Sequence, residues 1–202
     1  FSAALLRENA RRAAGASAAA AHREEELKRK VNGLLNKVTL ASLPTIVERL
    51  LTEPPMPSSA EDWGLVGGLI FDTGVTEHHY IETYAELCSM LASRLEAQVA
   101  PPATTVLLQR MLDRCQDEFE QLPSALSVAR QVASSGTSTE DVDYALRKVK
   151  ERALGNMKLV GQLFLRHLVS CSILWLIIRG LISEVERPEE LALETAAALL
   201  RA

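Results

Sequence analysis

The chain has 202 residues, of which 48% are hydrophobic, 24% are charged and only 4% are aromatic. That length is sufficient for one domain with a sizeable core, and the balance is that of an ordinary globular protein. The net charge of −4 excludes the strong positive field of a chain built to coat nucleic acid, although local basic patches remain open. Alanine and leucine predominate, which favours helices over strands.

Residues 1–30 predict a solvated helical extension. Acidic residues at 24–26 precede basic residues at 28–30 with the i,i+4 order that stabilises a helix. The alanine-rich stretch before them has almost nothing to bury, so such a helix is only marginally stable by itself. Because the sequence begins at Phe1 rather than Met, we expect it to be part of a longer protein, with a domain at 31–202.

From residue 31 onward, apolar residues recur at helical spacing. A short helix is expected over residues 31–38, and Thr39 can N-cap a second helix whose apolar face runs from Leu43 to Leu51. The proline-rich loop 53–59 ends this first pair, since proline cannot continue the helical hydrogen bonds.

The second pair begins with a helix that contains Val66 and is expected to stop near Gly74. Thr76 can cap its partner helix, and a second proline-containing break follows at 99–102. The partner helix has almost ideal 3.6-residue spacing of its apolar residues, which are Ile81, Tyr84, Cys88, Leu91 and Leu95.

Two further pairs are expected after this break. One apolar stripe runs over residues 108–122, and a polar loop at 134–139 separates it from a long helix over residues 142–168. A shorter helix is expected over residues 174–182, and Pro188 suits the first turn of the last helix.

The helices therefore form about four antiparallel pairs, each of about 40 residues, which is typical of HEAT-type repeats. Such repeats bury their apolar faces only by stacking on their neighbours. The sequence predicts an all-α, HEAT-repeat-like α-solenoid with an N-terminal helical extension, although the spacing alone leaves a globular helix bundle open. The residues expected in the core include Cys88, Cys115, Phe119, Val160 and Phe164.

The cysteines and the most apolar run indicate the cellular compartment of the protein. Cys88, Cys115 and Cys171 are odd in number, form no CxxC and lie in apolar helical patterns, which predicts buried thiols in a reducing compartment. The run 168–182 is shorter than the about 20 residues that span a bilayer, and it carries Arg179. No stretch resembles a signal peptide. We therefore expect a cytoplasmic protein without membrane contact.

No catalytic or cofactor-binding motif such as GxxxxGK, HExxH or GxSxG is present in the sequence. His78 and His79 are adjacent, so on a helix they point about 100° apart and do not chelate one metal well. Trp63, Trp175 and the glycines of 64–68 are expected in helix packing. We therefore expect no enzymatic activity, no cofactor and no metal site.

One basic cluster lies on the long helix of the third pair. Such a run is usually a solvated face, but lysine and arginine on one helix can also replace the counterions of an RNA backbone. Arg147, Lys150 and Lys158 are spaced to lie near one face, and Lys148 and Arg152 on an adjacent one. The candidate RNA-binding residues are therefore Arg147, Lys148, Lys150, Arg152 and Lys158.

Four segments, in order, resemble the middle domain of eukaryotic translation initiation factor 4-gamma. Each lies on helices that the apolar pattern predicts, and the resemblance covers residues 28–200. The segments are VNGLLNKVTL at 31–40, LIFD at 69–72 with YAELC at 84–88, RCQDEFE at 114–120 and LGNMKLVGQLF at 154–164.

This resemblance implies a HEAT-repeat scaffold that grips the two lobes of the DEAD-box RNA helicase initiation factor 4A and also binds RNA. The family domain has more helix pairs than are expected here, so the domain at 31–202 is expected to be truncated at its C-terminal end. The family's long acidic insertion in the third pair is replaced by a short Ser/Thr loop. A related scaffold of mRNA processing or decay, and a purely RNA-binding solenoid, remain alternatives.

The first segment matches the family's helicase-binding helix end, which straddles a turn between two helices. Turn residues at the edge of a solenoid are exposed, so Asn36 and Lys37 would offer donors to a partner. The apolar residues of the segment have the alternative role of holding the helix pair together. The resemblance assigns helicase binding to Leu35, Asn36, Lys37, Val38, Thr39 and Leu43.

Family members also assemble with the cap-binding initiation factor 4E through a segment outside this domain. Phe1 and Leu6 are spaced like the aromatic residue and the leucine of that recognition helix. Phenylalanine replaces the usual tyrosine, and Arg7 stands where an apolar residue is usual. We expect a weak contact there.

Overall fold

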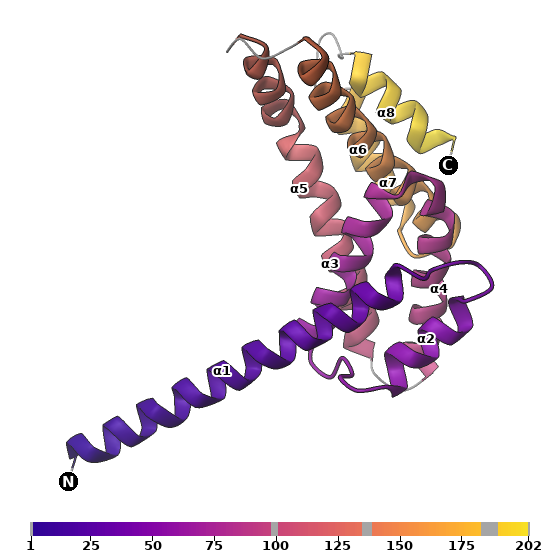
Figure 1. Ribbon diagram of the computed structural model, residues 1–202. Helices are drawn as coiled ribbons and strands as arrows, with labels where there is room; N and C mark the ends of the chain where they lie inside the picture. Colours follow the sequence, from indigo (N-terminus) through magenta and orange to yellow (C-terminus); the bar gives the residue numbers. More distant parts are fainter. Residues whose placement is uncertain (1, 98–100, 135–138, 183–189, 202) are drawn as a thin grey trace.

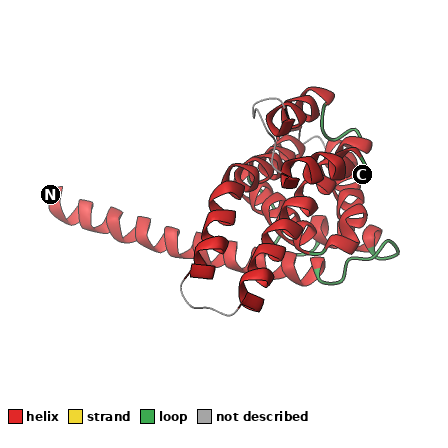
Figure 2. Ribbon diagram, turned by 90° about the horizontal axis from the view of Figure 1, so that it is seen from above, coloured by secondary structure: helices red, strands yellow, loops and turns green. Residues whose placement is uncertain are grey.

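The computed structural model describes residues 2–97, 101–134, 139–182 and 190–201, and within these ranges the chain forms helices and connecting turns without strands (Figures 1 and 2). The helices are α1 (Ser2–Leu35), α2 (Leu43–Thr52), α3 (Ala60–Thr76), the short 3₁₀ helix η1 (His78–Tyr80), α4 (Ile81–Ala97), α5 (Pro101–Ser134), α6 (Thr139–Leu165), α7 (Cys171–Ile182) and α8 (Glu190–Leu200).

The helices stack in two layers of alternate members. In one layer α1 packs on α3 and α3 packs on α5, and in the other α2, α4, α6 and α8 pack in succession. Consecutive helices pair as α3 with α4, α5 with α6 and α7 with α8. Figure 1 shows the long helices α5 and α6 side by side. The predicted all-α stack of helix pairs is confirmed.

The core forms where the apolar stripes of the two layers meet. Phe71 of α3 and Met111 of α5 are completely buried, and Tyr84 of α4 is 1% exposed. Within one layer, α3 and α5 approach closely at Gly67, where an added Cβ would lie 2.5 Å from the carbonyl oxygen of Leu107. No side chain fits there, so the predicted packing role of this glycine is confirmed.

The N-terminal extension and the first short helix are one continuous helix. The predicted separate helix from residue 31 is instead the end of α1, because no proline or cap interrupts the helix there and charge pairs such as Glu24–Lys28 continue it. Figure 1 shows the N-terminal part of α1 projecting away from the stack. Its final turns are anchored, since Leu27 and Val31 are 0% and 2% exposed.

Two predicted helix boundaries differ around the second pair. α3 continues through Gly74 and ends at Thr76, because Gly74 packs against the ring of Tyr84 in the helix interior. The Thr76 hydroxyl donates to the Asp72 carbonyl at 2.8 Å and does not cap α4, from which η1 separates it.

The long helix α6 ends at Leu165, three residues before the predicted Leu168. His167 has a left-handed backbone with φ of 60°. The Leu168 N–H donates to the Leu163 carbonyl at 3.0 Å, and the His167 N–H to the Phe164 carbonyl at 2.9 Å. This is a Schellman-type helix end, which terminates the hydrogen-bond ladder.

Three of the five predicted core residues are buried and two are only half-buried. Cys88, Cys115 and Val160 are at most 3% exposed, as predicted. Phe119 lines a groove between α5 and α7, and Phe164 lies in the last turn of α6 at the margin of the core. Periodicity places a residue on the apolar face but does not reveal whether another helix covers that part of the face.

The predicted burial of Trp175 and Cys171 is wrong. Trp175 is 65% exposed and Cys171 is also exposed, because α7 packs on α6 and α8 through its other side. Trp63 is 6% exposed and lies in the core, as predicted.

Several predicted features lie outside the described residues: the break at 99–100, the polar loop at 135–138, and Pro188 with Glu189. The last helix, α8, is described from Glu190. None of the helices in the described ranges has both the length and the apolar character needed to cross a membrane.

Candidate functional site

The α1–α2 turn, residues 36–42, is closed by its own hydrogen bonds. The Ser42 hydroxyl donates to the Lys37 carbonyl at 2.8 Å and accepts from the Thr39 N–H at 2.8 Å. The Ser42 N–H lies 3.2 Å from the Thr39 hydroxyl and 3.0 Å from its carbonyl. Thr39 therefore caps this turn and not α2 itself, which begins at Leu43.

Burial divides the predicted helicase-binding residues into two groups. Leu35, Val38 and Leu43 are 3%, 8% and 2% exposed and belong to the core, so their role in the structure is packing. The side chains that face solvent, as the sequence predicts for the first two, are Asn36, Lys37 and Thr39.

One residue of the turn was not among the predicted site residues. Leu40 is 70% exposed and adds an apolar side chain to the polar ones around it. The sequence signal was available, because this leucine lies in the same matched segment but outside the apolar stripes of both neighbouring helices.

Tyr84 of α4 supports the turn from beneath. Its hydroxyl donates to the Glu77 carboxylate at 2.9 Å and lies 3.4 Å from the Leu35 carbonyl oxygen at the end of α1. Burial, followed by the Glu77 carboxylate, raises the pKa of Tyr84 above its ordinary value, so the hydroxyl remains a donor. Tyr84 is thereby bonded to the end of α3 and lies against the last residue of α1 before the turn.

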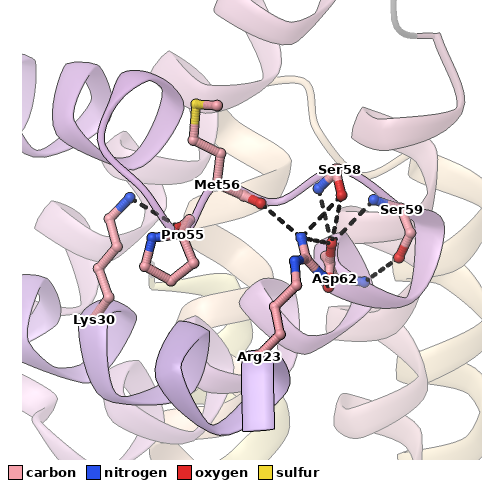
Figure 3. A network of polar contacts seen from close by, with 7 residues as sticks. All are labelled: Arg23, Lys30, Pro55, Met56, Ser58, Ser59 and Asp62. Atoms are coloured by element: carbon pink, nitrogen blue, oxygen red, sulfur yellow. Dashed lines mark hydrogen bonds and ion pairs between the residues drawn. The ribbon is translucent and has the colours of Figure 1, made fainter. Parts of the chain in front are cut away.

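A second set of contacts, the Arg23–Asp62 network, fixes α1 to the loop before α3 (Figure 3). The Arg23 guanidinium donates to both Asp62 carboxylate oxygens at 3.1 and 2.8 Å, and to the Met56 carbonyl at 2.9 Å. Asp62 also accepts from the backbone N–H groups of Ser58 and Ser59 at 2.8 and 3.1 Å. With the Ser59 hydroxyl accepting from the Asp62 N–H, these bonds form the capping box that starts α3.

The network has an electrostatic consequence. The hydrogen bonds from Arg23, followed by those from the two serine N–H groups, hold the pKa of Asp62 well below its ordinary value despite the burial of the carboxylate. Lys30 adds a further tie to the same loop, since its ammonium donates to the carbonyls of Glu53 and Pro55, the latter at 3.2 Å (Figure 3). The C-terminal part of the predicted extension, residues 23–30, is therefore anchored to this loop and not simply solvated.

The structure separates the five candidate RNA-binding residues. Arg147 and Lys148 are exposed on α6, with the Lys148 ammonium 5.7 Å from the centre of the Tyr144 ring, and Lys150 is half-buried in the same turn. Lys158, two turns further on, lines a cleft together with residues of η1 and α8.

Arg152 is occupied by contacts within the fold. Its guanidinium bonds to the Glu118 carboxylate at 2.5 and 2.8 Å and lies 3.5 Å from an Asp72 oxygen. The hydrogen bonds that Arg152 donates to Glu118 raise the pKa of Arg152, so the guanidinium stays protonated and its charge is balanced by the carboxylate. The sequence could not reveal this, because Asp72 and Glu118 are far away along the chain.

A cleft of about 890 Å³ lies where η1, α6 and α8 meet. Lys158, His78, His79 and Arg201 line it together with the carboxylate of Glu194. Among the described residues, no group of three His, Cys, Asp or Glu side chains is placed to hold a metal ion.

The buried thiols are poor nucleophiles. Burial raises the pKa of the Cys88 thiol to about 12 and also raises that of Cys115, and a neutral thiol reacts slowly.

The predicted contact for a cap-binding factor falls at the start of α1. Phe1 lies outside the described residues, and Leu6 is part of the α1 helix. These two positions therefore stay a prediction.

With this geometry established, comparison with known proteins identifies the class. The MIF4G domain family matches residues 28–202, which include the α1–α2 turn and the stack of helix pairs. The chain belongs to the MIF4G domain family.

The relatives found are translation initiation factors. The chain is 29% identical over 196 residues to eukaryotic translation initiation factor 4 gamma of Schizosaccharomyces pombe, which covers 87% of the chain. It is 27% identical over 185 residues to factor 4G of Arabidopsis thaliana and 27% identical over 153 residues to factor 4 gamma 1 of Mus musculus, covering 89% and 69% of the chain. The chain spans only 14%, 10% and 9% of these three relatives.

A solved structure supports the fold. The MIF4G domain of Trypanosoma cruzi translation initiation factor EIF4G5 matches 87% of this chain and 76% of its own, with a TM-score of 0.63 and 21% identity. The resemblance predicted from the four sequence segments is confirmed.

Proposed function

We propose that this chain is a translation initiation scaffold in the cytoplasm that binds and activates a DEAD-box RNA helicase of the initiation factor 4A type. The observation that carries the proposal is the α1–α2 turn, where Asn36, Lys37 and Thr39 face solvent on a hydrogen-bonded frame next to the exposed Leu40. The translation role is favoured over mRNA processing or decay by the family membership and by the relatives described above, which are translation initiation factors.

The physical form of the turn suits a transient protein interface. An apolar side chain surrounded by polar donors concentrates binding energy in a few contacts, with a rim that excludes water. Because the hydrogen bonds of Ser42 hold the turn in place, a partner would not have to order it on binding. Leu35, Val38 and Leu43 contribute by packing the turn onto the core.

RNA binding is an auxiliary part of the proposal. Arg147 and Lys148 are the exposed members of the basic cluster and would contact phosphates, with Lys150 at their edge. Arg152 would contribute little, since its charge is already paired with Glu118. We also propose a contact of Phe1 and Leu6 with cap-binding initiation factor 4E, which rests on the spacing of these two residues.

The test is helicase affinity measured by calorimetry with nuclease-treated proteins. Replacing Asn36 and Lys37 together with alanine is expected to cost about 1–3 kcal/mol of binding free energy, the usual loss at important interface residues. Leu40→Ser is expected to weaken binding as well. A thermal melt of each variant should be unchanged, because all three side chains are exposed.

The matched control is the double variant Arg29→Ala and Asn32→Ala, which removes one cation and one amide from exposed positions one to two turns earlier on α1. It should bind as the unaltered chain does. Full affinity in the Asn36/Lys37 variant would place the helicase elsewhere on the stack. Binding that disappears with nuclease treatment would favour a purely RNA-binding solenoid.

A further inference from the structure

A second surface, remote in sequence from the α1–α2 turn, is a groove of about 480 Å³ between α5 and α7, which we call the α5–α7 groove. It lies where the regular stacking of the first layer changes. α1, α3 and α5 pack in succession, whereas α7 packs on α6 and α8.

The groove has an apolar floor that no described helix covers. Leu176 of α7 is 64% exposed, and Phe119 of α5 is only half-buried. The apolar lining is formed by Leu112, Phe119, Met157, Ile173, Leu176 and Ile177.

One wall of the groove is acidic. Gln109, Asp113, Gln116 and Glu120 follow one another at i, i+4, i+7 and i+11 and form a single row along α5. The two glutamines donate to the two carboxylates, Gln109 to Asp113 at 2.9 Å and Gln116 to Glu120 at 2.7 Å, which orients both along the wall. No lysine or arginine is among the described residues that line the groove.

The spacing of these carboxylates defines the shape of a complementary ligand. Asp113 and Glu120 are seven residues apart on α5, which is two turns and about 10 Å. A helix lying along α5 presents side chains at the same two-turn repeat, with apolar residues between them at i+3 and i+4.

We propose that the α5–α7 groove binds an amphipathic helix of a partner protein. The apolar stripe of that helix packs on Leu176, Phe119 and Ile177, and two basic residues seven positions apart pair with Asp113 and Glu120. The commitment to a basic partner rests on charge complementarity, since the wall is acidic and the lining carries no positive charge. The groove is built from helices other than those of the helicase turn, so this proposal does not depend on the proposed function.

The experiment uses the whole chain and a synthetic helical probe of about four turns, with leucines at i, i+3, i+4 and i+7 and lysines two turns apart. A matched peptide has glutamates in place of the lysines. Fluorescence anisotropy should show that the lysine peptide binds at least about tenfold more tightly than the glutamate peptide, a difference of about 1.4 kcal/mol.

Two variants test the site itself. The double reversal Asp113→Lys and Glu120→Lys should lower the affinity for the lysine peptide about tenfold or more and raise that for the glutamate peptide, and Leu176→Ser should weaken both. The control reversal Glu25→Lys and Glu151→Lys makes the same change in net charge at exposed positions outside the groove and should leave both affinities unchanged. Circular dichroism checks that each variant keeps its helices.

The proposal is overturned if neither peptide binds, if both bind equally, or if the reversal inside the groove has no more effect than the control. Sedimentation of the chain alone tests the competing occupant. Self-association that Leu176→Ser abolishes would assign the groove to a second copy instead of a basic partner.

Discussion

The first and last helix pairs of the stack differ in the kind of side chain that they expose. At the first pair, α1 is fixed to the loop before α3 by the Arg23–Asp62 network and by Lys30, and the exposed side chains described on α2 are polar or proline. At the last pair, apolar side chains face solvent on both helices. These are Trp175 and Leu176 of α7 and Leu193 and Leu200 of α8.

The difference shows how stacked repeats divide their work. Each pair buries its apolar face only against a neighbour, so an outer face that ends a stack must be polar to remain in water. The first pair meets that condition, and its polar groups bond to a loop. The last described pair instead exposes apolar side chains of the kind that pack against another protein surface, among them Leu176 in the α5–α7 groove and Leu193 in the cleft beside Lys158.

The largest predicted contrast is between the two tryptophans. Trp63 is 6% exposed near the anchored end, and Trp63→Ala should cost about 3–5 kcal/mol of unfolding free energy through the cavity it leaves. Trp175 is 65% exposed, so Trp175→Ala should change stability by no more than about 0.5 kcal/mol. Urea unfolding of both variants, followed by circular dichroism, measures the difference.

Fluorescence provides the control, because the chain has two tryptophans and each variant leaves one as a reporter. The Trp63→Phe variant, which retains Trp175, should be quenched readily by acrylamide, and the Trp175→Phe variant should resist quenching. Equal losses of stability at the two positions would mean that the last pair is covered in solution.

The same two residues show how far the sequence predicts the fold. Both have apolar neighbours, so periodicity places both on apolar faces, and the order of the helices from α2 to α8 follows correctly from such stripes. Which faces are covered depends on contacts between distant helices, and this is why Trp175, Phe119 and Phe164 were predicted to be more buried than they are. The single helix α1 was missed because a change in amphipathic character resembles a boundary.

The features of the candidate site likewise divide into those that the local sequence predicts and those that depend on contacts between distant helices. The exposure of Asn36 and Lys37 followed from their place in a turn, a local property. The pairing of Arg152 with Glu118, and of Arg23 with Asp62, joins residues 34 and 39 positions apart, so no local pattern contains them. Leu40 lies outside both helical stripes, so its exposure also follows from a local property of the sequence.

The next prediction removes the centre of the anchored end. Asp62→Ala leaves Arg23 and the N–H groups of Ser58 and Ser59 without their acceptor, and we expect a loss of about 2–3 kcal/mol of stability, as for a buried, charged hydrogen-bond partner. The matched control is Glu82→Ala, which removes an acidic residue from the first turn of α4 at an exposed position. If both variants melt alike, the network contributes no more than an ordinary helix-end charge.

The smallest predicted effect is the dependence of this anchor on pH. Because the pKa of Asp62 is held below its ordinary value in the folded chain, the unfolded chain binds the proton more readily as the pH falls. The stability that Asp62 provides is therefore complete above the unfolded pKa of about 3.9, and it is lost as the pH falls from there toward the folded pKa. Between the unfolded and the folded pKa, each unit of pH lowers the free energy of unfolding by about 1.36 kcal/mol. Since pH 3 lies about one unit below the unfolded pKa, the loss from this group alone should be about 1 kcal/mol there.

The variant Asp62→Asn, which cannot titrate, tests this dependence. It should be less stable at pH 7 but should lose about 1 kcal/mol less than the unaltered chain between pH 5 and pH 3 in urea titrations. Parallel curves for the two chains over that range would mean that the Asp62 carboxylate has an ordinary pKa in solution. The polar end of the stack would then be held by Lys30 and the packing of Leu27 and Val31, not by the ion pair with Arg23.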